Sequence, residues 1–464
     1  MEKYDAIIIG AWSAGLGCLG MAKALGWRSV IIDKSEENIG GDCLNFGCVP
    51  SKALIHVAKY FYGAKQATRF GLKTSGKANW SEVIQYVHDK QAIIRAHESA
   101  DYLRQNGENL VIGAATFKDK HTIEVNGQLY KGDKIFICTG SHPRHIPFEG
   151  IDKVNWFSNE TLFYDMKTLP EEFIIIGGGP IGCEMAQVFQ RLGSSVSIID
   201  RGDRLLGKER AEASVILQGQ FEREGIQMYF NHDVVKFENG TAVVIKNRAT
   251  EATQTLSLDA CLLAVGRGMN HASLDVAAAG LEETERGKLV INDYLQTSES
   301  HIYAVGDAAG MYQFSHGAEK HVNLLKHNFN KILDKKHHVK GLSWVTFTEP
   351  EIATFGFSEQ YLQENKIDYW RQDQVFDRDD KAITAEYDYG KITLFVSKEK
   401  NKLRRKILGG TIVSPNAGEI MQELHLATTA DLCLADFMDK VYAYPTASRI
   451  NQQTIKGIVN YKEE

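Results

Sequence analysis

Two cysteines, Cys43 and Cys48, lie in the stretch IGGDCLNFGCVPSKALIHVAKY, and their spacing suits redox chemistry only under one condition. Residues five apart in a regular helix rise about 7.5 Å along its axis, whereas the Cα atoms of a disulfide lie about 4.4–6.8 Å apart. The pair therefore closes only if the backbone bows outward, which the segment Asn45-Phe46-Gly47 suits. The alternative interpretation is two buried, reduced cysteines that only pack.

A helix is expected to begin near Val49, because Pro50 suits a first helical turn. The helix dipole would then stabilise the Cys48 thiolate and lower the pKa of that thiol. Lys52 lies one turn further along. The remaining cysteines fall in predicted helices or strands and are interpreted as packing residues: Cys18, Cys138, Cys183, Cys261 and Cys433.

The elements that must position this pair begin with a predicted βαβ unit at the N-terminal end. An apolar strand at residues 4–10 ends in glycine, a helix is expected from Ala14 to Leu25, and a second strand ends at Asp33. In such a unit, backbone N–H groups of the glycine-rich turn and the helix N-terminus bind a pyrophosphate, and the acidic residue binds a ribose.

A second unit of the same kind follows in EFIIIGGGPIGCEMAQVFQRLGSSVSIIDRGDR. The strand 173–176 leads into Gly177, Gly179 and Gly182, and a later strand ends at Asp200. Asp200 favours NADH, because a carboxylate there accepts hydrogen bonds from ribose hydroxyls. Two nearby residues complicate this prediction, since Arg201 and Arg204 either bind the 2′-phosphate of NADPH or are surface residues.

The first turn, GAWSAG, departs from this pattern at Trp12. Gly10 and Gly15 keep their places, so Trp12 stands where the second glycine normally lets the phosphate approach. A bulky side chain there should displace the pyrophosphate or shift the loop. Three accounts remain open: a cofactor bound by a rearranged loop, a cofactor bound weakly, or an engineered or accidental substitution.

Length and composition limit the fold and the partners. A chain of 464 residues is expected to form roughly three domains. Without an apolar run long enough for a membrane span, and without a basic leader, we expect a cytoplasmic protein. The net charge of −6, with acidic and basic residues interspersed, argues against a nucleic-acid partner.

Further motifs extend over the whole chain and carry a family resemblance. They are ICTGSHP at 137–143, AVGRGMN at 264–270, IYAVGDAAG and TEPEIATFGFSE. With GGDCLNFGCVPSK and the two turns, they resemble the class I pyridine nucleotide-disulfide oxidoreductases, the family of dihydrolipoyl dehydrogenase, glutathione reductase and mercuric reductase. The resemblance implies an α/β homodimer with two Rossmann-like dinucleotide-binding domains plus a C-terminal α+β dimerisation domain.

The expected domains are an FAD-binding domain from residues 1–150 and 271–345, an NAD(P)-binding domain at 151–270 and a dimerisation domain at 346–464. The resemblance implies FAD and either NADH or NADPH as cofactors. The residues expected to hold them are Gly10, Trp12, Gly15, Asp33, Lys34, Gly41, Thr139, Gly140, Gly177, Gly179, Gly182, Asp200, Arg201, Gly266, Gly306 and Asp307, and no metal-ligand set is expected.

The resemblance also implies roles for the residues near the cysteines. Cys48 would face the flavin and Cys43 would attack the substrate. Lys52 and Glu184 would form an ion pair near the flavin N5. Asp33 would bind the adenosine ribose of FAD, and Asp307 would bind its ribitol or pyrophosphate side.

The segment AYPTASRI resembles the family's H-P-T-x-x-E motif, but Tyr444 replaces the histidine and Arg449 replaces the glutamate. A tyrosine with a pKa near 10 is a poor proton donor to a leaving thiolate, whereas an imidazole has a pKa near 6.5. We therefore count Tyr444 among the catalytic residues but expect weak glutathione or lipoamide turnover.

A small acceptor such as a soft metal ion needs no such proton donor, and mercuric reductases resemble this chain in carrying tyrosine there. Their C-terminal cysteine pair and N-terminal CxxC domain are not present in this sequence. His316 and His321 either touch a substrate or metal or only pack. Other acceptors stay open, namely an unusual disulfide, a quinone or lipoamide, as does a non-catalytic nucleotide-binding descendant.

Overall fold

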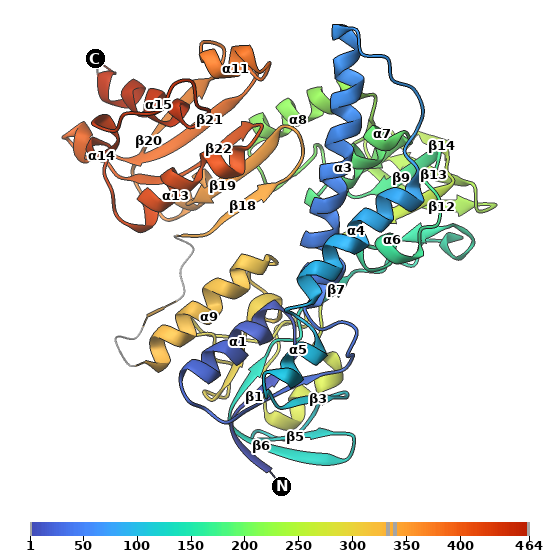
Figure 1. Cartoon of the computed structure of the whole chain (residues 1–464), viewed down its shortest axis with the longest axis vertical. Coiled ribbons are helices and arrows are strands. Elements are labelled where there is room, and N and C mark those ends of the chain that lie inside the picture. The colour runs from blue at the N-terminus through green and yellow to red at the C-terminus, as the bar shows by residue number, and fades with distance from the viewer. Residues whose placement is uncertain (1, 331–334, 337–340, 462–464) are drawn as a thin grey trace.

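The first sheet contains the N-terminal strand and a strand from much later in the chain (Figure 1). The computed structural model describes residues 2–330, 335–336 and 341–461. The strand order is β3-β2-β1-β6-β5-β4, with β17 also pairing β6. The bounds are β1 (Glu2–Ile9), β2 (Ser29–Asp33), β3 (Leu110–Ile112), β4 (Thr116–Asp119), β5 (Thr122–Val125), β6 (Gln128–Ile137) and β17 (Ile302–Ala304).

Buried apolar strands build the parallel core of this sheet. β2 is buried along its whole length, and β1 pairs with both β2 and β6 in parallel. Two helices pack against each other beside it, α1 (Ser13–Ala24) and α9 (Ser315–Phe329). The chain leaves this sheet after β6, forms the second unit and returns through β17, so segments far apart in sequence share one core.

The second sheet is wholly parallel, with the order β11-β10-β9-β15-β8. Its strands are β8 (Trp156–Phe157), β9 (Glu172–Ile176), β10 (Ser195–Ile199), β11 (Gln227–Tyr229) and β15 (Ala260–Leu263). The helices that follow β9 and β10 are α7 (Pro180–Leu192) and α8 (Ala211–Glu224). A smaller antiparallel sheet is formed by β12 (His232–Glu238), β13 (Ala242–Asn247) and β14 (Thr253–Ser257).

Two long helices lie beside the second sheet (Figure 1). The short α2 (Gly41–Asn45) leads into α3 (Cys48–Ala67), which packs against α4 (Trp80–Arg95) and α7. Apolar residues of α3 join the core of the second unit, so α3 is anchored on that unit. The remaining elements here are α5 (Ala100–Gln105), α6 (Asn159–Asp165), β7 (Ser141–Pro143) and β16 (Arg267–Met269).

The third sheet is antiparallel and lies at the upper left of Figure 1. Its order is β18-β19-β22-β21-β20, from β18 (Ser343–Thr346), β19 (Glu351–Gly356), β20 (Tyr369–Val375), β21 (Lys391–Ser397) and β22 (Ile407–Ser414). The helices around it are α10 (Glu359–Glu364), α11 (Asp380–Thr384), α12 (Ala417–Ile420), α13 (Gln422–Thr429), α14 (Ala435–Met438) and α15 (Arg449–Asn460).

The predicted fold class is confirmed by this arrangement of two Rossmann-like units and an α+β unit. The prediction about cysteine positions is wrong in two cases. Cys138 directly follows β6, and Cys433 forms only an isolated bridge with Lys406, so neither lies in a helix or strand. Cys18, Cys183 and Cys261 are buried within α1, α7 and β15.

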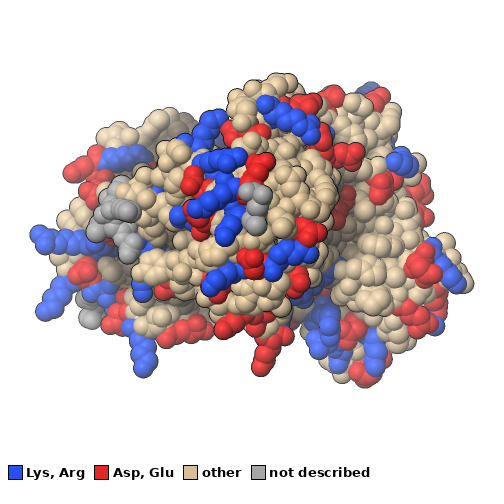
Figure 2. All heavy atoms as spheres, turned by 90° about the horizontal axis from the view of Figure 1, so that it is seen from below, with Lys and Arg blue, Asp and Glu red and all other residues tan. Residues whose placement is uncertain are grey.

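The surface and the helices bear on possible partners. On the face drawn in Figure 2, Lys and Arg side chains intermingle with Asp and Glu side chains. Such mixing offers no broad basic surface for a phosphate backbone on that face. Within residues 2–330, 335–336 and 341–461, no helix is both long and apolar enough to span a bilayer.

Candidate active site

A corner between two helices brings the two cysteines together. Cys43 lies in α2, and Cys48 is the first residue of α3, one position before the predicted start. The break falls at Phe46 and Gly47, where the sequence predicted a bow. A Cβ on Gly47 would lie 2.8 Å from Oδ2 and 2.9 Å from the carbonyl oxygen of Asp42. Only glycine therefore allows this corner to close without a local shift.

The two thiols differ strongly in acidity. The pKa of Cys48 is lowered to about 6, first by a hydrogen bond from the Cys43 thiol and then by Ser315 and the charge of Lys52. The Ser315 hydroxyl lies 3.3 Å from the Cys48 sulfur at the start of α9. The hydrogen bond with Cys48, together with burial, raises the pKa of Cys43. In the reduced pair, Cys48 is thus the thiolate and Cys43 the thiol near pH 7.

A lysine and a glutamate from different units meet beside this corner. Lys52 Nζ donates to Glu184 Oε2 at 2.7 Å, and Glu184 Oε1 accepts the backbone N–H of Phe347 at 2.9 Å. Lys52 Nζ also lies 4.4 Å from the centre of the Phe347 ring. Glu184 is 6% exposed, so α3, α7 and the C-terminal unit together fix the position of the lysine charge.

A polar network that the sequence did not predict connects the α2–α3 corner with Asp307, which lies in the motif IYAVGDAAG. Arg267 donates to Ser141 Oγ at 2.7 Å and pairs with Asp42 at 3.1 Å. Ser141 Oγ donates to Asp307 Oδ2 at 2.5 Å, and Asn159 donates to Asp42 at 2.9 Å. Burial raises the pKa of Asp307, although its hydrogen bond from Ser141 opposes this.

The two glycine-rich turns have the same backbone hydrogen bonds. Ala11 N–H donates to Asp33 Oδ2 at 2.7 Å in the first turn, and Gly178 N–H donates to Asp200 Oδ2 at 2.5 Å in the second. A Cβ on Gly15 would lie 1.8 Å from the carbonyl oxygen of Gly10, and one on Gly182 would lie 1.9 Å from that of Gly177. These glycines let each helix start directly against its strand. Burial raises the pKa of Asp33.

Trp12 is where the two turns differ. Its indole packs between Gly41 and Gly140, since a Cβ on Gly41 would lie 2.3 Å from the Trp12 Cγ and one on Gly140 would lie 2.4 Å from its Cε3. The loop has not shifted, because Trp12 has φ −95° and ψ −175° while Gly179 has φ −76° and ψ −177°.

Apart from Trp12, the first turn fits FAD. It offers a buried carboxylate, Asp33, at the end of β2 and a glycine cradle at Gly10, Gly15, Gly41 and Gly140. The buried hydroxyl of Thr139 has no hydrogen-bond partner among the described residues, as expected of a group that awaits a polar ligand.

In the second turn, both nearby arginines have protein partners. Arg201 pairs with Asp233 at 2.7 Å and is 74% exposed at its side chain. Arg204 pairs with Asp203 and donates to the carbonyl oxygen of Gly207 at 3.0 Å. The Oδ1 atom of Asp200 accepts the N–H of Gly202 at 2.6 Å. Both arginines are thus engaged by protein groups, and Asp200 accepts backbone N–H groups on both sides of its carboxylate.

The other predicted site residues lie in several places. Gly306 is buried, and its N–H donates to Nδ1 of the fully buried His321 at 3.1 Å. His316 is exposed, and its Nε2 lies 2.6 Å from the carbonyl oxygen of Ser343. Lys34 and Gly266 are exposed. His321 thus supports the Asp307 motif through the backbone, and His316 joins α9 to β18.

Tyr444 is not brought together with the cysteine pair within this one chain. It lies in the segment before α15, is 65% exposed and donates to Asp380 Oδ2 at 2.9 Å. The hydrogen bond to Asp380 raises the pKa of Tyr444. Arg449 lies 4.0 Å from the same carboxylate.

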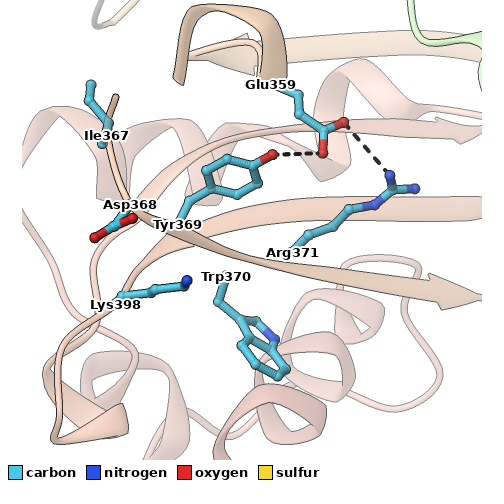
Figure 3. A pocket seen from close by; sticks show the side chains of 7 residues that line it. All are labelled: Glu359, Ile367, Asp368, Tyr369, Trp370, Arg371 and Lys398. Carbon is cyan, nitrogen blue, oxygen red and sulfur yellow. Dashed lines mark hydrogen bonds and ion pairs between the residues drawn. The ribbon is translucent and has the colours of Figure 1, made fainter. Parts of the chain in front are cut away.

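A separate surface groove of about 500 Å³ lies along β20 (Figure 3). Three of its lining residues are linked, since Tyr369 donates to Glu359 at 3.0 Å and Arg371 pairs with Glu359 at 3.7 Å. Arg371 also pairs with Glu212 of α8 at 2.7 Å. One side of the groove is therefore formed by an ion pair that links the second unit and the C-terminal unit.

The fold and the site define a class of protein that comparison with known families makes explicit. Residues 4–322 match the model of pyridine nucleotide-disulphide oxidoreductases, and residues 342–454 match the dimerisation domain of that family. The chain belongs to the pyridine nucleotide-disulphide oxidoreductase family. The resemblance inferred from the motifs is confirmed, and the chain is an oxidoreductase of the flavoprotein type.

Individual relatives narrow the comparison. Mercuric reductase of Staphylococcus aureus is 29% identical over 445 residues, which cover 96% of this chain and 80% of the relative. Dihydrolipoyl dehydrogenase of Mycoplasma genitalium is 30% identical over 474 residues, 98% of each chain. A solved Cu(II) complex of the HOCl-induced flavoprotein disulfide reductase RclA from Escherichia coli superimposes with a TM-score of 0.83 at 25% identity and covers 98% of this chain and 99% of its own.

Proposed function

We propose that this chain is a flavoprotein reductase that passes electrons from NADH through Cys43 and Cys48 to a soft metal ion. The unequal acidity of the two thiols at the α2–α3 corner carries this proposal. FAD, when bound, would supply the acceptor for the nicotinamide hydride and the donor of the electron pair to the disulfide. Asp33, Thr139, Gly41, Gly140 and Asp307 are the residues proposed to hold it.

Residues of the chain itself set the protonation states of the two cysteines and the position of Lys52. The N-terminus of α3 and the charge of Lys52 stabilise the Cys48 thiolate, so this sulfur carries the negative charge once the disulfide has been reduced. Glu184 holds Lys52 in place through the 2.7 Å ion pair. Reduction of the disulfide by two electrons and one proton leaves Cys43 as the thiol, and Cys43 is proposed to meet the acceptor.

The acidity of Cys43 favours a metal over a disulfide as the acceptor. Thiol–disulfide exchange needs the Cys43 thiolate, and Tyr444 and Arg449 offer no imidazole to remove the proton. A soft metal ion displaces the proton of the thiol as it binds, so it needs no base. The names of the Staphylococcus mercuric reductase and of the Cu(II) complex of RclA point in the same direction.

A homodimer is proposed as the active form. The match of residues 342–454 to a dimerisation domain supports it. Leu426, Val441 and Tyr444 of that region are 59%, 93% and 65% exposed in the single chain, and exposed apolar groups of this kind are typical of interfaces. Light scattering should give twice the 51.9 kDa of one chain.

An acceptor screen tests the proposal. Protein loaded with FAD should oxidise NADH faster with Hg(II) or Cu(II) than with glutathione disulfide or lipoamide, and Cys43→Ser should abolish the metal reaction. The double variant Tyr444→His with Arg449→Glu should raise disulfide turnover, since an acid/base group is worth about 100-fold or more. Faster turnover of either disulfide by the unmodified protein would contradict the proposal, and no turnover with any acceptor would favour a non-catalytic descendant.

A further inference from the structure

The two glycine-rich turns share one backbone conformation but differ in the residue at the N-cap position. Each turn places an N-cap residue in the same extended conformation, Trp12 before α1 and Gly179 before α7. The carbonyl oxygen of Trp12 accepts Leu16 N–H at 2.8 Å, and that of Gly179 accepts Cys183 N–H at 2.9 Å. Differences at the two helix starts therefore come from the side chain and not from the loop.

At Gly179 the space in front of the helix is open. A Cβ placed on Gly179 would meet no heavy atom within 4 Å. At Trp12 the corresponding direction is filled by the indole, which lies in contact with Gly41 on one side and Gly140 on the other. We call the space bounded by Trp12, Gly41 and Gly140 the first-turn crevice.

The walls of the crevice are backbone that cannot retreat easily. Gly41 and Gly140 both have φ +69°, and both are buried. Gly40 N–H donates to the Ala11 carbonyl oxygen at 3.0 Å, and the Gly140 carbonyl oxygen accepts Asn270 N–H at 3.2 Å. The crevice therefore opens only if the indole itself moves.

A pyrophosphate bound by this turn must approach the helix start where the second glycine normally stands. In this chain the indole already fills that approach. We propose that Trp12 is a plug that competes with FAD for the first-turn crevice, so that FAD binds only after the indole leaves. This inference rests on the proposed function, because it takes FAD as the ligand of the first turn.

Residue 12 then sets how tightly FAD is held, while Asp33, Thr139 and Asp307 set where it is held. The unmodified protein is expected to lose FAD on dialysis. Trp12→Gly should bind FAD at least about tenfold more tightly, which corresponds to about 1.4 kcal/mol. Trp12→Ala should lie between the two, because it removes the indole but keeps a Cβ toward the phosphate.

The test is an FAD titration of the full-length protein, followed by flavin fluorescence and by the flavin absorbance retained after dialysis. Trp27→Phe is the matched control, since it removes a tryptophan that packs on Phe329 outside the crevice. Its dissociation constant for FAD should equal that of the unmodified protein. Gly179→Trp installs the same side chain in the second turn and should weaken NADH binding about tenfold while leaving the FAD dissociation constant unchanged. Circular dichroism checks the fold of each variant.

Each result bears on one of two claims. Equal FAD dissociation constants for the unmodified protein, Trp12→Gly and Trp12→Ala, all near or below micromolar, would overturn the plug. Tight FAD binding by Trp12→Gly alone, with no reduction of that FAD by NADH, would uphold the plug and overturn the proposed function. If Trp12→Gly unfolds, the comparison between Trp12→Ala and Trp27→Phe decides in the same way.

Discussion

At the scale of single residues, the site depends on which thiol holds the negative charge. The Cys43 hydrogen bond, the Ser315 hydroxyl and the charge of Lys52 all lower the pKa of Cys48. Of these groups, only Ser315 lies far from Cys48 in sequence. The sequence suggested the helix dipole and placed Lys52 one turn away, whereas the structure adds hydrogen-bond donors from α2 and α9.

The pH dependence of alkylation tests this assignment. Because the pKa of Cys48 is lowered to about 6, its thiolate is present above that pH and is lost as the pH falls through it. The rate of iodoacetamide modification of Cys48 in the reduced protein should rise with a midpoint near pH 6 and then level off. Ser315→Ala should move the midpoint upward, since the Ser315 hydrogen bond lowers this pKa. A midpoint near the ordinary value of 9.0 would contradict the assignment.

The preference for NADH or NADPH is also expected to depend on single residues. Arg201 is paired with Asp233, and Asp200 points its carboxylate toward the second turn. We expect NADH to bind at least about tenfold more tightly than NADPH, measured by nicotinamide fluorescence. Arg201→Ser should leave this ratio unchanged. A selective loss of NADPH binding in that variant would instead identify Arg201 as a ligand of the 2′-phosphate.

At the scale of elements, the corner between α2 and α3 brings Cys43 and Cys48 together, which a continuous helix would prevent. It ends one helix after Asn45 and starts the next at Cys48, so that residues five apart face each other. The sequence predicted this break because a disulfide at that spacing is impossible in a regular helix. It did not predict that Asp42 would receive both Arg267 and Asn159, since those residues lie far away in sequence.

Replacing the glycine of this corner should separate the thiols. In Gly47→Ala the new Cβ would meet Asp42 at 2.8 and 2.9 Å, so the corner must open. The equilibrium constant for forming the Cys43–Cys48 disulfide in a glutathione buffer should fall about tenfold. Gly63→Ala is the control within α3, because a Cβ there meets nothing within 4 Å. An equal effect of both substitutions would rule out the corner as the cause.

At the scale of the whole molecule, an ion-pair network joins the second unit to the C-terminal unit. Arg191 of α7 pairs with Glu224 at 2.7 Å and with Glu349 before β19 at 2.5 Å. The side chains of Arg191 and Glu224 are 3% and 4% exposed. The second unit and the C-terminal unit therefore share one ion-pair network beside the Lys52–Glu184 pair.

Breaking this network should cost much stability. Arg191→Met leaves two carboxylates without their partner and should lower the free energy of unfolding by about 3–5 kcal/mol. Arg28→Met removes an ion pair with Glu2 in which the two side chains are 58% and 50% exposed. This variant should change the free energy of unfolding by less than about 1 kcal/mol. Urea unfolding followed by circular dichroism compares the two variants. Similar midpoints for both would show that the buried network contributes no more to stability than an exposed ion pair does.

The sequence predicted elements better than contacts between them. The βαβ units at Asp33 and Asp200 were predictable because strand, turn and helix are local patterns. The network of Arg267, Ser141 and Asp307 was not, because the fold assembles it from separate segments. For Trp12, the sequence left a shifted loop open, whereas the unchanged backbone conformation and the packing of the indole were visible only in three dimensions.

The central claim is that electrons from NADH reach the cysteine pair. The most direct measurement is anaerobic treatment of air-oxidised, FAD-loaded protein with one equivalent of NADH, followed by alkylation and peptide mass spectrometry. We predict that the peptide with Cys43 and Cys48 changes from a disulfide to two alkylated thiols only when both FAD and NADH are present. A disulfide that survives NADH in the FAD-loaded protein, yet yields to dithiothreitol, would contradict the account.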